Sequence, residues 1–126
     1  MKSMEIISTE NAPKAIGPYS QAICVGSFVF TSGQIPINPA TGNIEATTIE
    51  AQAEQVMKNL GEVLKAAGSG FEKAVKTTCF LANMEDFAAF NGVSAQYFTT
   101  KPARSCVAVK TLPKNVLVEV EVIATL

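Results

Sequence analysis

The chain has 126 residues, 48% of them hydrophobic, and its ten lysine and arginine side chains face eleven aspartates and glutamates, for a net charge of −1. This length suits one domain, taken here as residues 1–126, and the charge balance gives no electrostatic reason to expect binding to nucleic acid or to an anionic membrane. Histidine is absent, which excludes Ser-His and Cys-His nucleophile mechanisms and histidine-based metal sites within one chain.

Cysteine usage and hydropathy indicate where in the cell the protein is located and whether its subunits associate. Three cysteines without a C-x-x-C pair favour reduced thiols and therefore a cytoplasmic protein. The first five residues are not followed by the apolar core of a signal peptide, and no apolar run approaches the roughly 20 residues of a membrane span. The mean hydropathy of +0.23 is high for a small soluble monomer, so we expect a buried subunit interface.

Short strands dominate the first third of the chain. Ile6–Ile7 is a short candidate strand, and residues 21–25 and 28–32 read as two strands joined by a tight hairpin at Gly26–Ser27. After Gly33, residues 34–47 are interrupted by Pro36, Pro39 and Gly42, which predicts an irregular connection.

A helix follows this connection. Thr47 and Glu50 have the spacing of a capping box, and Gly68 offers a C-terminal stop. Between them the apolar residues recur at helical intervals: Val56, Leu60, Val63, Leu64 and Ala67.

The second half predicts a strand, a helix and two more strands. The strand covers 74–81, with Val75, Thr77, Cys79 and Leu81 on one face. The helix begins near Asn83 or Asp86 and runs to about Thr99, and the last strands cover 105–110 and 116–125. The final strand is apolar at its even positions. This order predicts an α+β fold in which two helices pack on one face of a mostly antiparallel sheet, and the other face needs a partner or a polar surface.

Arg104 is the only arginine of the chain, since the other nine cations are lysines. Its planar guanidinium can grip a carboxylate through two parallel hydrogen bonds, which an ammonium group cannot do. The last two strands could form a hairpin. One face of the sheet would then carry Arg104, Cys106, Glu119 and Glu121 in any register in which the residue numbers of two directly paired residues add up to an odd number. The alternative is an ordinary ion pair on a solvated face.

A ligand pocket built on these residues would hold a substrate carboxylate at Arg104 and a water molecule at a glutamate. Cys106 would supply a wall or backbone hydrogen bonds, because no histidine is present to activate it as a nucleophile. Three further segments could line the pocket through Tyr19, through Ser32 and Gly33, and through Asn91. The structural alternatives are a core anchor for Tyr19, a strand-end turn for Ser32 and Gly33, and an exposed helix position for Asn91.

Four motifs occur together in order, and they resemble the RidA group of the Rid (YjgF-type) family of reactive-intermediate deaminases over nearly the whole length. The motifs are Gly17-Pro18-Tyr19-Ser20-Gln21-Ala22, Thr31-Ser32-Gly33-Gln34-Ile35-Pro36, Pro102-Ala103-Arg104-Ser105-Cys106-Val107 and Val118-Glu119-Val120-Glu121.

The resemblance implies a chorismate-mutase-like (YjgF-type) fold and a homotrimer with ligand clefts between subunits. It implies hydrolysis of 2-imino acids and their enamine tautomers, such as 2-iminobutanoate and 2-iminopropanoate, to 2-oxo acids and ammonia, without a cofactor or a metal. In the family pattern Arg104 matches the carboxylate-binding arginine and Glu119 the residue that positions water. Cys106 and Gly33 line the pocket, with Tyr19, Ser32 and Asn91 as neighbours.

Two other functions stay open on sequence grounds. The same pocket could bind a 2-oxo acid or an amino acid without turnover, and the trimer could regulate a partner protein. A ribonuclease or translation inhibitor is disfavoured by the acidic balance, the single arginine and the missing histidine. The connection Thr99–Ala103 is shorter than we expect for the RidA group, which leaves the substrate range open.

Overall fold

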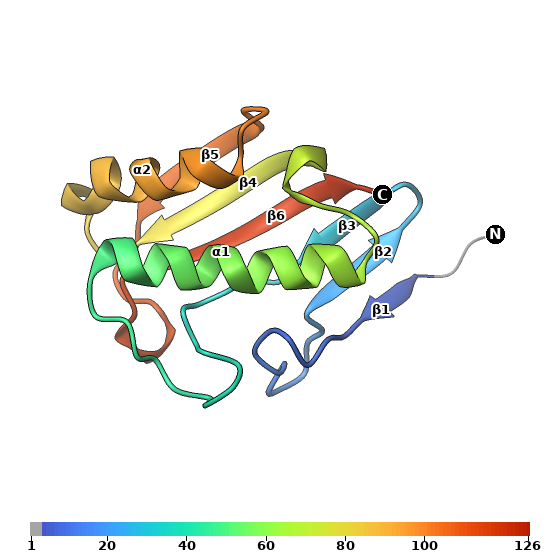
Figure 1. The fold of residues 1–126 in the computed structure, drawn as a ribbon, viewed down its shortest axis with the longest axis horizontal. Helices are drawn as coiled ribbons and strands as arrows, with labels where there is room; N and C mark the ends of the chain where they lie inside the picture. Colours follow the sequence, from blue (N-terminus) through green and yellow to red (C-terminus); the bar gives the residue numbers. More distant parts are fainter. Residues whose placement is uncertain (1–3) are drawn as a thin grey trace.

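The computed structural model describes residues 4–126 as one six-stranded sheet with two α-helices on one of its faces (Figure 1). The strand order is β1-β2-β3-β6-β4-β5, and every neighbouring pair is antiparallel except β4 with β5. The α+β class and the mostly antiparallel sheet are therefore confirmed. The strands are β1 (Glu5–Ile7), β2 (Ala22–Val25), β3 (Phe28–Thr31), β4 (Ala74–Leu81), β5 (Ala103–Ala108) and β6 (Val118–Thr125), and the α-helices are α1 (Ile49–Ala66) and α2 (Phe87–Tyr97).

The last strand, β6, lies at the centre of the sheet between β3 and β4. Its even-numbered residues Val118, Val120, Val122 and Ala124 are buried under the helices, whereas the odd-numbered ones are half-buried. The predicted alternation is confirmed, and it is what a central strand with one covered face requires.

The predicted hairpin of β2 and β3 is also confirmed, with Val25 opposite Phe28 and Gly26 at φ +59° in the turn. In β4 the face prediction holds for three of four residues, because Thr77, Cys79 and Leu81 are buried. Val75 is exposed instead. The register with β6 shifts between Ala74 and Lys76, and such a bulge turns the extra residue away from the core.

Helix α1 starts one residue later than the capping-box spacing predicts. Thr48 is the N-cap, and its Oγ1 accepts a hydrogen bond of 3.2 Å from the Ala51 N–H. Helix α2 follows a short 3-10 turn at Met84–Asp86, where Asn83 accepts a bond of 2.9 Å from the Glu85 N–H. The Tyr97 hydroxyl at the end of α2 donates to the Glu54 carboxylate of α1, which fixes the two helices relative to each other.

The predicted hairpin between the last two strands is wrong. β5 pairs in parallel with β4 at the edge of the sheet, with Thr77 opposite Arg104 and Cys79 opposite Cys106, and it makes no ladder with β6. The physical reason lies in burial. β6 has an apolar face that must be covered along its whole length, which favours the centre, whereas β5 is mostly exposed on both faces and suits an edge.

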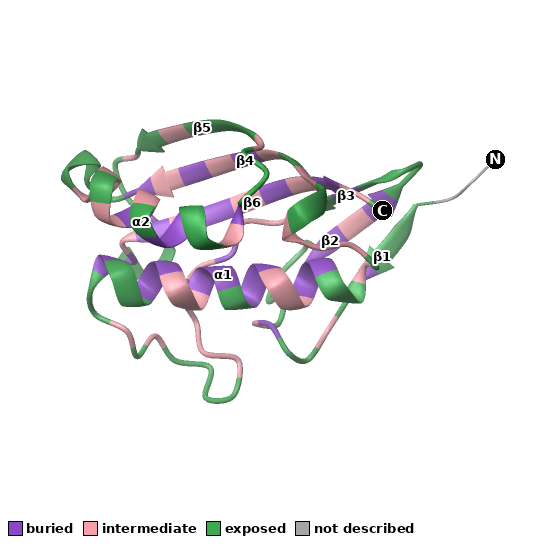
Figure 2. Ribbon diagram, turned by 45° about the horizontal axis from the view of Figure 1, so that its top comes forward, coloured by how far each residue is buried: buried purple, intermediate pink, exposed green. Residues whose placement is uncertain are grey.

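Both helices cover the same face of the sheet, which we call the helix side, and the other face, the open side, has no covering element among residues 4–126 (Figure 2). The open side is apolar in several places, as the exposed side chains of Phe28, Phe30, Val75 and Val107 illustrate. No helix within the described part of the chain is long and apolar enough to cross a membrane.

Candidate functional site

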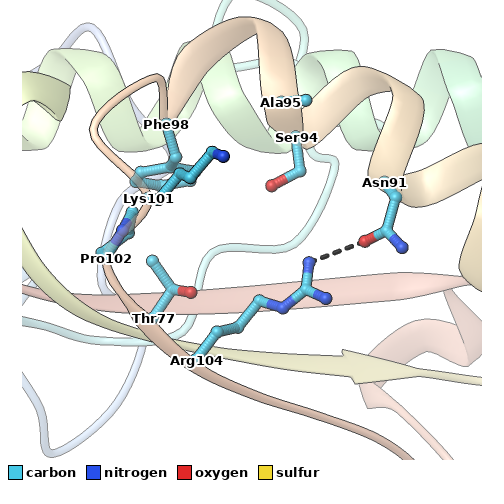
Figure 3. Close-up of a pocket in the computed structure, with 8 residues that line it drawn as sticks. All are labelled: Thr77, Asn91, Ser94, Ala95, Phe98, Lys101, Pro102 and Arg104. Carbon is cyan, nitrogen blue, oxygen red and sulfur yellow. Dashed lines mark hydrogen bonds between the residues drawn. The ribbon is translucent and has the colours of Figure 1, made fainter.

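Arg104 lies at the start of the edge strand β5, and its side chain extends over the helix side toward α2 (Figure 3). One guanidinium nitrogen donates a hydrogen bond of 2.6 Å to the Asn91 Oδ1 of α2, and the group stands 5.4 Å from the centre of the Phe87 ring. Neither contact neutralises the positive charge, because an amide and an aromatic ring carry no formal charge. The guanidinium is thus oriented and still able to bind an anion.

A cavity of about 350 Å³ lies beside this guanidinium, between α2 and the strands β4 and β5 (Figure 3). It is lined by Thr77, Asn91, Ser94, Ala95, Phe98, Lys101, Pro102 and Arg104. The sequence identified Arg104 and Asn91 as site candidates but missed the other six. Two signals were available: Ser94 follows Asn91 by three residues and so shares its helix face, and Lys101–Pro102 directly precede the arginine motif.

Cys106 lies two residues beyond Arg104 on the same side of β5, opposite Cys79 of β4. Burial raises the pKa of the Cys106 thiol, and the positive charge of Arg104 offsets this only in part. A thiol that stays protonated is a poor nucleophile. Its place beside Arg104 therefore suits a neutral wall, one of the two roles that the sequence analysis leaves open for Cys106.

Glu119 of β6 lies on the open side, opposite Phe80 of β4. Gly33 packs directly against it: a Cβ added at Gly33 would lie 2.8 Å from the Glu119 Cδ, so any other residue would make this carboxylate shift from its position. The segment is fixed by paired backbone bonds between Gln34 and Val120, of 2.9 and 3.2 Å. Burial, and secondarily the negative charge of Glu121, raises the pKa of Glu119 above its usual value.

Tyr19 stands on a turn that is tied to the end of β3. Gly17 has φ +134°, and the Ser32 hydroxyl donates a bond of 2.5 Å to the Ser20 carbonyl. The Tyr19 side chain is 54% exposed, and it lines a cavity of about 190 Å³ together with Gly33. Tyr19 is therefore no core anchor, which removes the structural alternative for this residue.

The seven candidate residues form two groups that do not meet within one chain. The arginine half-site lies on α2 and on the helix side of β5 and consists of Asn91, Arg104 and Cys106. The glutamate half-site lies at the end of β3 and on the open side of β6 and consists of Tyr19, Ser32, Gly33 and Glu119. The prediction that Arg104 and Glu119 share a face is wrong. Arg104 is opposite Thr77 of β4, whereas Glu119 is opposite Phe80, three residues further along the same strand. Residues an odd number apart point to opposite faces, so the two side chains lie on different sides of the sheet.

Comparison with known proteins identifies the family. A family model described as Endoribonuclease L-PSP matches residues 9–126. The chain belongs to this family. The resemblance to YjgF and RidA proteins is thereby confirmed, and the family includes relatives named for deamination as well as relatives named otherwise.

Three similar proteins illustrate how differently such relatives are named. The Escherichia coli K12 protein named 2-iminobutanoate/2-iminopropanoate deaminase is 48% identical over 122 residues, covering 94% of this chain and 94% of its own. A Lactococcus lactis protein described as a proposed regulator, AldR, is 54% identical over 122 residues, covering 96% and 97%. The crystal structure of Escherichia coli TdcF with bound serine superposes with a TM-score of 0.92 at 44% identity, covering 97% and 98%.

Proposed function

We propose that this protein hydrolyses 2-imino acids and their enamine tautomers, 2-iminobutanoate and 2-iminopropanoate among them, to 2-oxo acids and ammonia. The observation that carries the proposal is the un-neutralised guanidinium of Arg104, held by Asn91 and Phe87 at the mouth of a cavity. A relative 48% identical to this chain bears the name of this activity.

The proposed reaction needs only a few groups of the protein. Arg104 holds the substrate carboxylate, and Glu119 holds a water molecule and accepts a proton as the water oxygen adds to the imine carbon. The carbinolamine nitrogen then takes this proton from Glu119. Ammonia leaves as the C–N bond breaks and the hydroxyl group loses its proton to solvent, which leaves the 2-oxo acid. The imine carbon is already electrophilic, so orientation of the two reactants supplies most of the acceleration.

The two half-sites of one chain face different sides of the sheet, so we infer that each complete site is built from two copies. In a head-to-tail ring the arginine half-site of one subunit meets the glutamate half-site of the next, and a homotrimer closes such a ring with three equivalent clefts. The apolar open side, with Phe28, Phe30 and Val107 exposed, gives the ring an interface to bury.

A binding protein without turnover is the second candidate, since one relative is described as a proposed regulator and another was crystallised with serine. It would use Arg104 in the same way and would not need Glu119. Endoribonuclease activity, which the family description names, has less support, because the chain offers one arginine and a net charge of −1 to a polyanion.

A coupled assay tests the proposed activity. Threonine dehydratase releases 2-iminobutanoate, and the formation of 2-oxobutanoate is followed with and without this protein while semicarbazide competes for free imine. We expect faster hydrolysis and less semicarbazone with the protein present. An unchanged rate over a wide range of protein concentration would remove deamination and favour the binding protein.

The raised pKa of Glu119 predicts a pH dependence. Glu119 must be ionised to accept a proton, so activity falls as the pH drops through its folded-state pKa, and a raised pKa places this fall at a higher pH than for an ordinary glutamate. Because the charge of Glu121 contributes to the shift, Glu121→Gln should move the acid limb of kcat/KM to lower pH. The measurement is the pH profile of kcat/KM for both proteins on one substrate. Any titration of the imine then affects both profiles equally and drops out of their comparison. A limb that stays in place or moves upward would show that another group titrates.

A further inference from the structure

The cavity beside Arg104 contains more polar groups than a 2-imino acid with a short apolar side chain can use. Ser94 is only 6% exposed and lines the cavity, and Figure 3 shows its hydroxyl directed into the cavity. Thr77 is 2% exposed and its Oγ1 receives only a long contact of 3.9 Å from the Cys79 thiol. Both side chains line the cavity, so their hydroxyls are placed where a polar ligand could bind them.

A second cation borders the same cavity. Lys101 belongs to the five-residue connection between α2 and β5, the segment whose shortness the sequence already marks. In the view of Figure 3 its ammonium end points toward the side of the cavity where Ser94 lies, whereas the Arg104 guanidinium lies at the Asn91 end.

The backbone holds Lys101 in this place at some cost. Its φ of +56° lies in the left-handed region, which is unfavourable for a residue with a Cβ, and the following Pro102 restricts it further. Strained backbone at the rim of a cavity is a feature that ligand sites tolerate. The lysine is therefore presented to the cavity by a constrained loop, although its side chain is exposed to solvent.

We propose that Lys101 and Ser94 are specificity-determining residues that select 2-imino acids carrying a second carboxylate at the end of their side chain. Arg104 takes the carboxylate next to the imine, and the distal carboxylate accepts hydrogen bonds from the Lys101 ammonium and the Ser94 hydroxyl. This inference rests on the proposed function for its reaction, in which water adds and ammonia leaves as before. The cavity of about 350 Å³ leaves room for a chain of four or five carbons.

The test compares the imines formed from aspartate and glutamate by an amino-acid oxidase with the imine formed from norvaline, a neutral counterpart. We expect kcat/KM to be about tenfold higher for the dianionic imines, the effect of one charge-assisted hydrogen bond at a partly exposed position. Lys101→Met should remove most of this preference through KM, with a clearly larger loss on the dianionic imines than on the neutral one. Ser94→Ala should remove part of it. The matched control is Lys58→Met, which removes a lysine from the exposed surface of α1.

Equal kcat/KM for the two kinds of imine in the wild type, or equal losses on both in Lys101→Met, would overturn the inference. Calorimetric titration with the stable dicarboxylic and monocarboxylic 2-oxo acids separates it from the proposed function. If no imine is hydrolysed but the dicarboxylic acid binds more tightly in a Lys101-dependent manner, the proposed function fails and the pocket assignment stands. If 2-iminobutanoate is hydrolysed without any dicarboxylate preference, the assignment fails and the proposed function stands.

Discussion

Arg104→Lys should lower kcat/KM for 2-iminobutanoate by about 100-fold, which corresponds to about 2–3 kcal/mol of lost transition-state stabilisation. The variant keeps the positive charge but loses the planar fork that binds a carboxylate with two hydrogen bonds. It also loses the geometry that the Asn91 Oδ1 and the Phe87 ring impose on the guanidinium. The coupled dehydratase assay measures the loss, and most of the gain over the uncatalysed reaction should vanish.

The reverse exchange at an exposed cation, Lys110→Arg, controls for a general effect of changing side chains next to β5 and should keep the wild-type rate. Thermal unfolding and the oligomer mass of Arg104→Lys should match the wild type, because the residue is exposed at a sheet edge. A fully active Arg104→Lys would show that a point charge suffices and that the bidentate clamp is wrong.

Glu119→Gln should lower kcat by about 100-fold, the lower end of what a general acid or base contributes, because the imine is already reactive. Gln has the same shape, so it fits beside Gly33 where a larger residue would not. It cannot accept the proton from water. The stable product 2-oxobutanoate should still bind, with a dissociation constant within about twofold of the wild type, because its carboxylate is held at Arg104.

Glu121→Gln is the matched control, since it removes the neighbouring carboxylate of the same strand and leaves Glu119 in place. Glu121→Gln should retain most of the wild-type kcat at pH values above the acid limb of the pH profile. A Glu119→Gln variant with full activity would mean that another group positions the water. Loss of 2-oxobutanoate binding in that variant would instead place Glu119 in carboxylate recognition.

Local patterns predicted most of the secondary structure. The β2–β3 hairpin follows from a Gly-Ser turn between two apolar runs, and the buried face of β6 follows from its strict alternation. The predicted start of α2 near Asn83 or Asp86 is confirmed, and the error at the start of α1 has a local cause. Thr47 and Thr48 are equally good N-caps by type, and only the backbone shows that Thr48 accepts the bond from Ala51.

Strand order was not available from local patterns. The hairpin expected between the last two strands assumed that sequence neighbours pair, whereas β6 lies between β3 and β4 and leaves β5 at the edge. Parity along a strand holds except at a bulge such as the one at Val75, but which residues share a face across strands depends on which strands are neighbours. This is why Arg104 and Glu119, both identified by residue type and motif, belong to different sides of the sheet.

The cavity lining was missed for a related reason. Ser94 and Thr77 read as ordinary helix and strand residues, and only packing shows that their hydroxyls face the space beside Arg104. Lys101 lies in the short connection before β5, and only the structure shows that it stands at the rim of this cavity.

The claim that one site requires two subunits has a direct test in mixed oligomers. Arg104→Lys and Glu119→Gln are each inactivated in one half-site, and the two proteins are refolded together from denaturant in equal amounts. In a head-to-tail ring about a quarter of the clefts then combine a wild-type arginine half-site with a wild-type glutamate half-site. As a control, the double variant is refolded in equal amounts with the wild type.

The account predicts that the mixture of the two single variants recovers about a quarter of the wild-type activity, and that the wild type mixed with the double variant shows the same fraction. If both half-sites of one chain formed the site, the single variants would stay inactive in the mixture and the control would retain about half of the activity. That second result would contradict the intersubunit site.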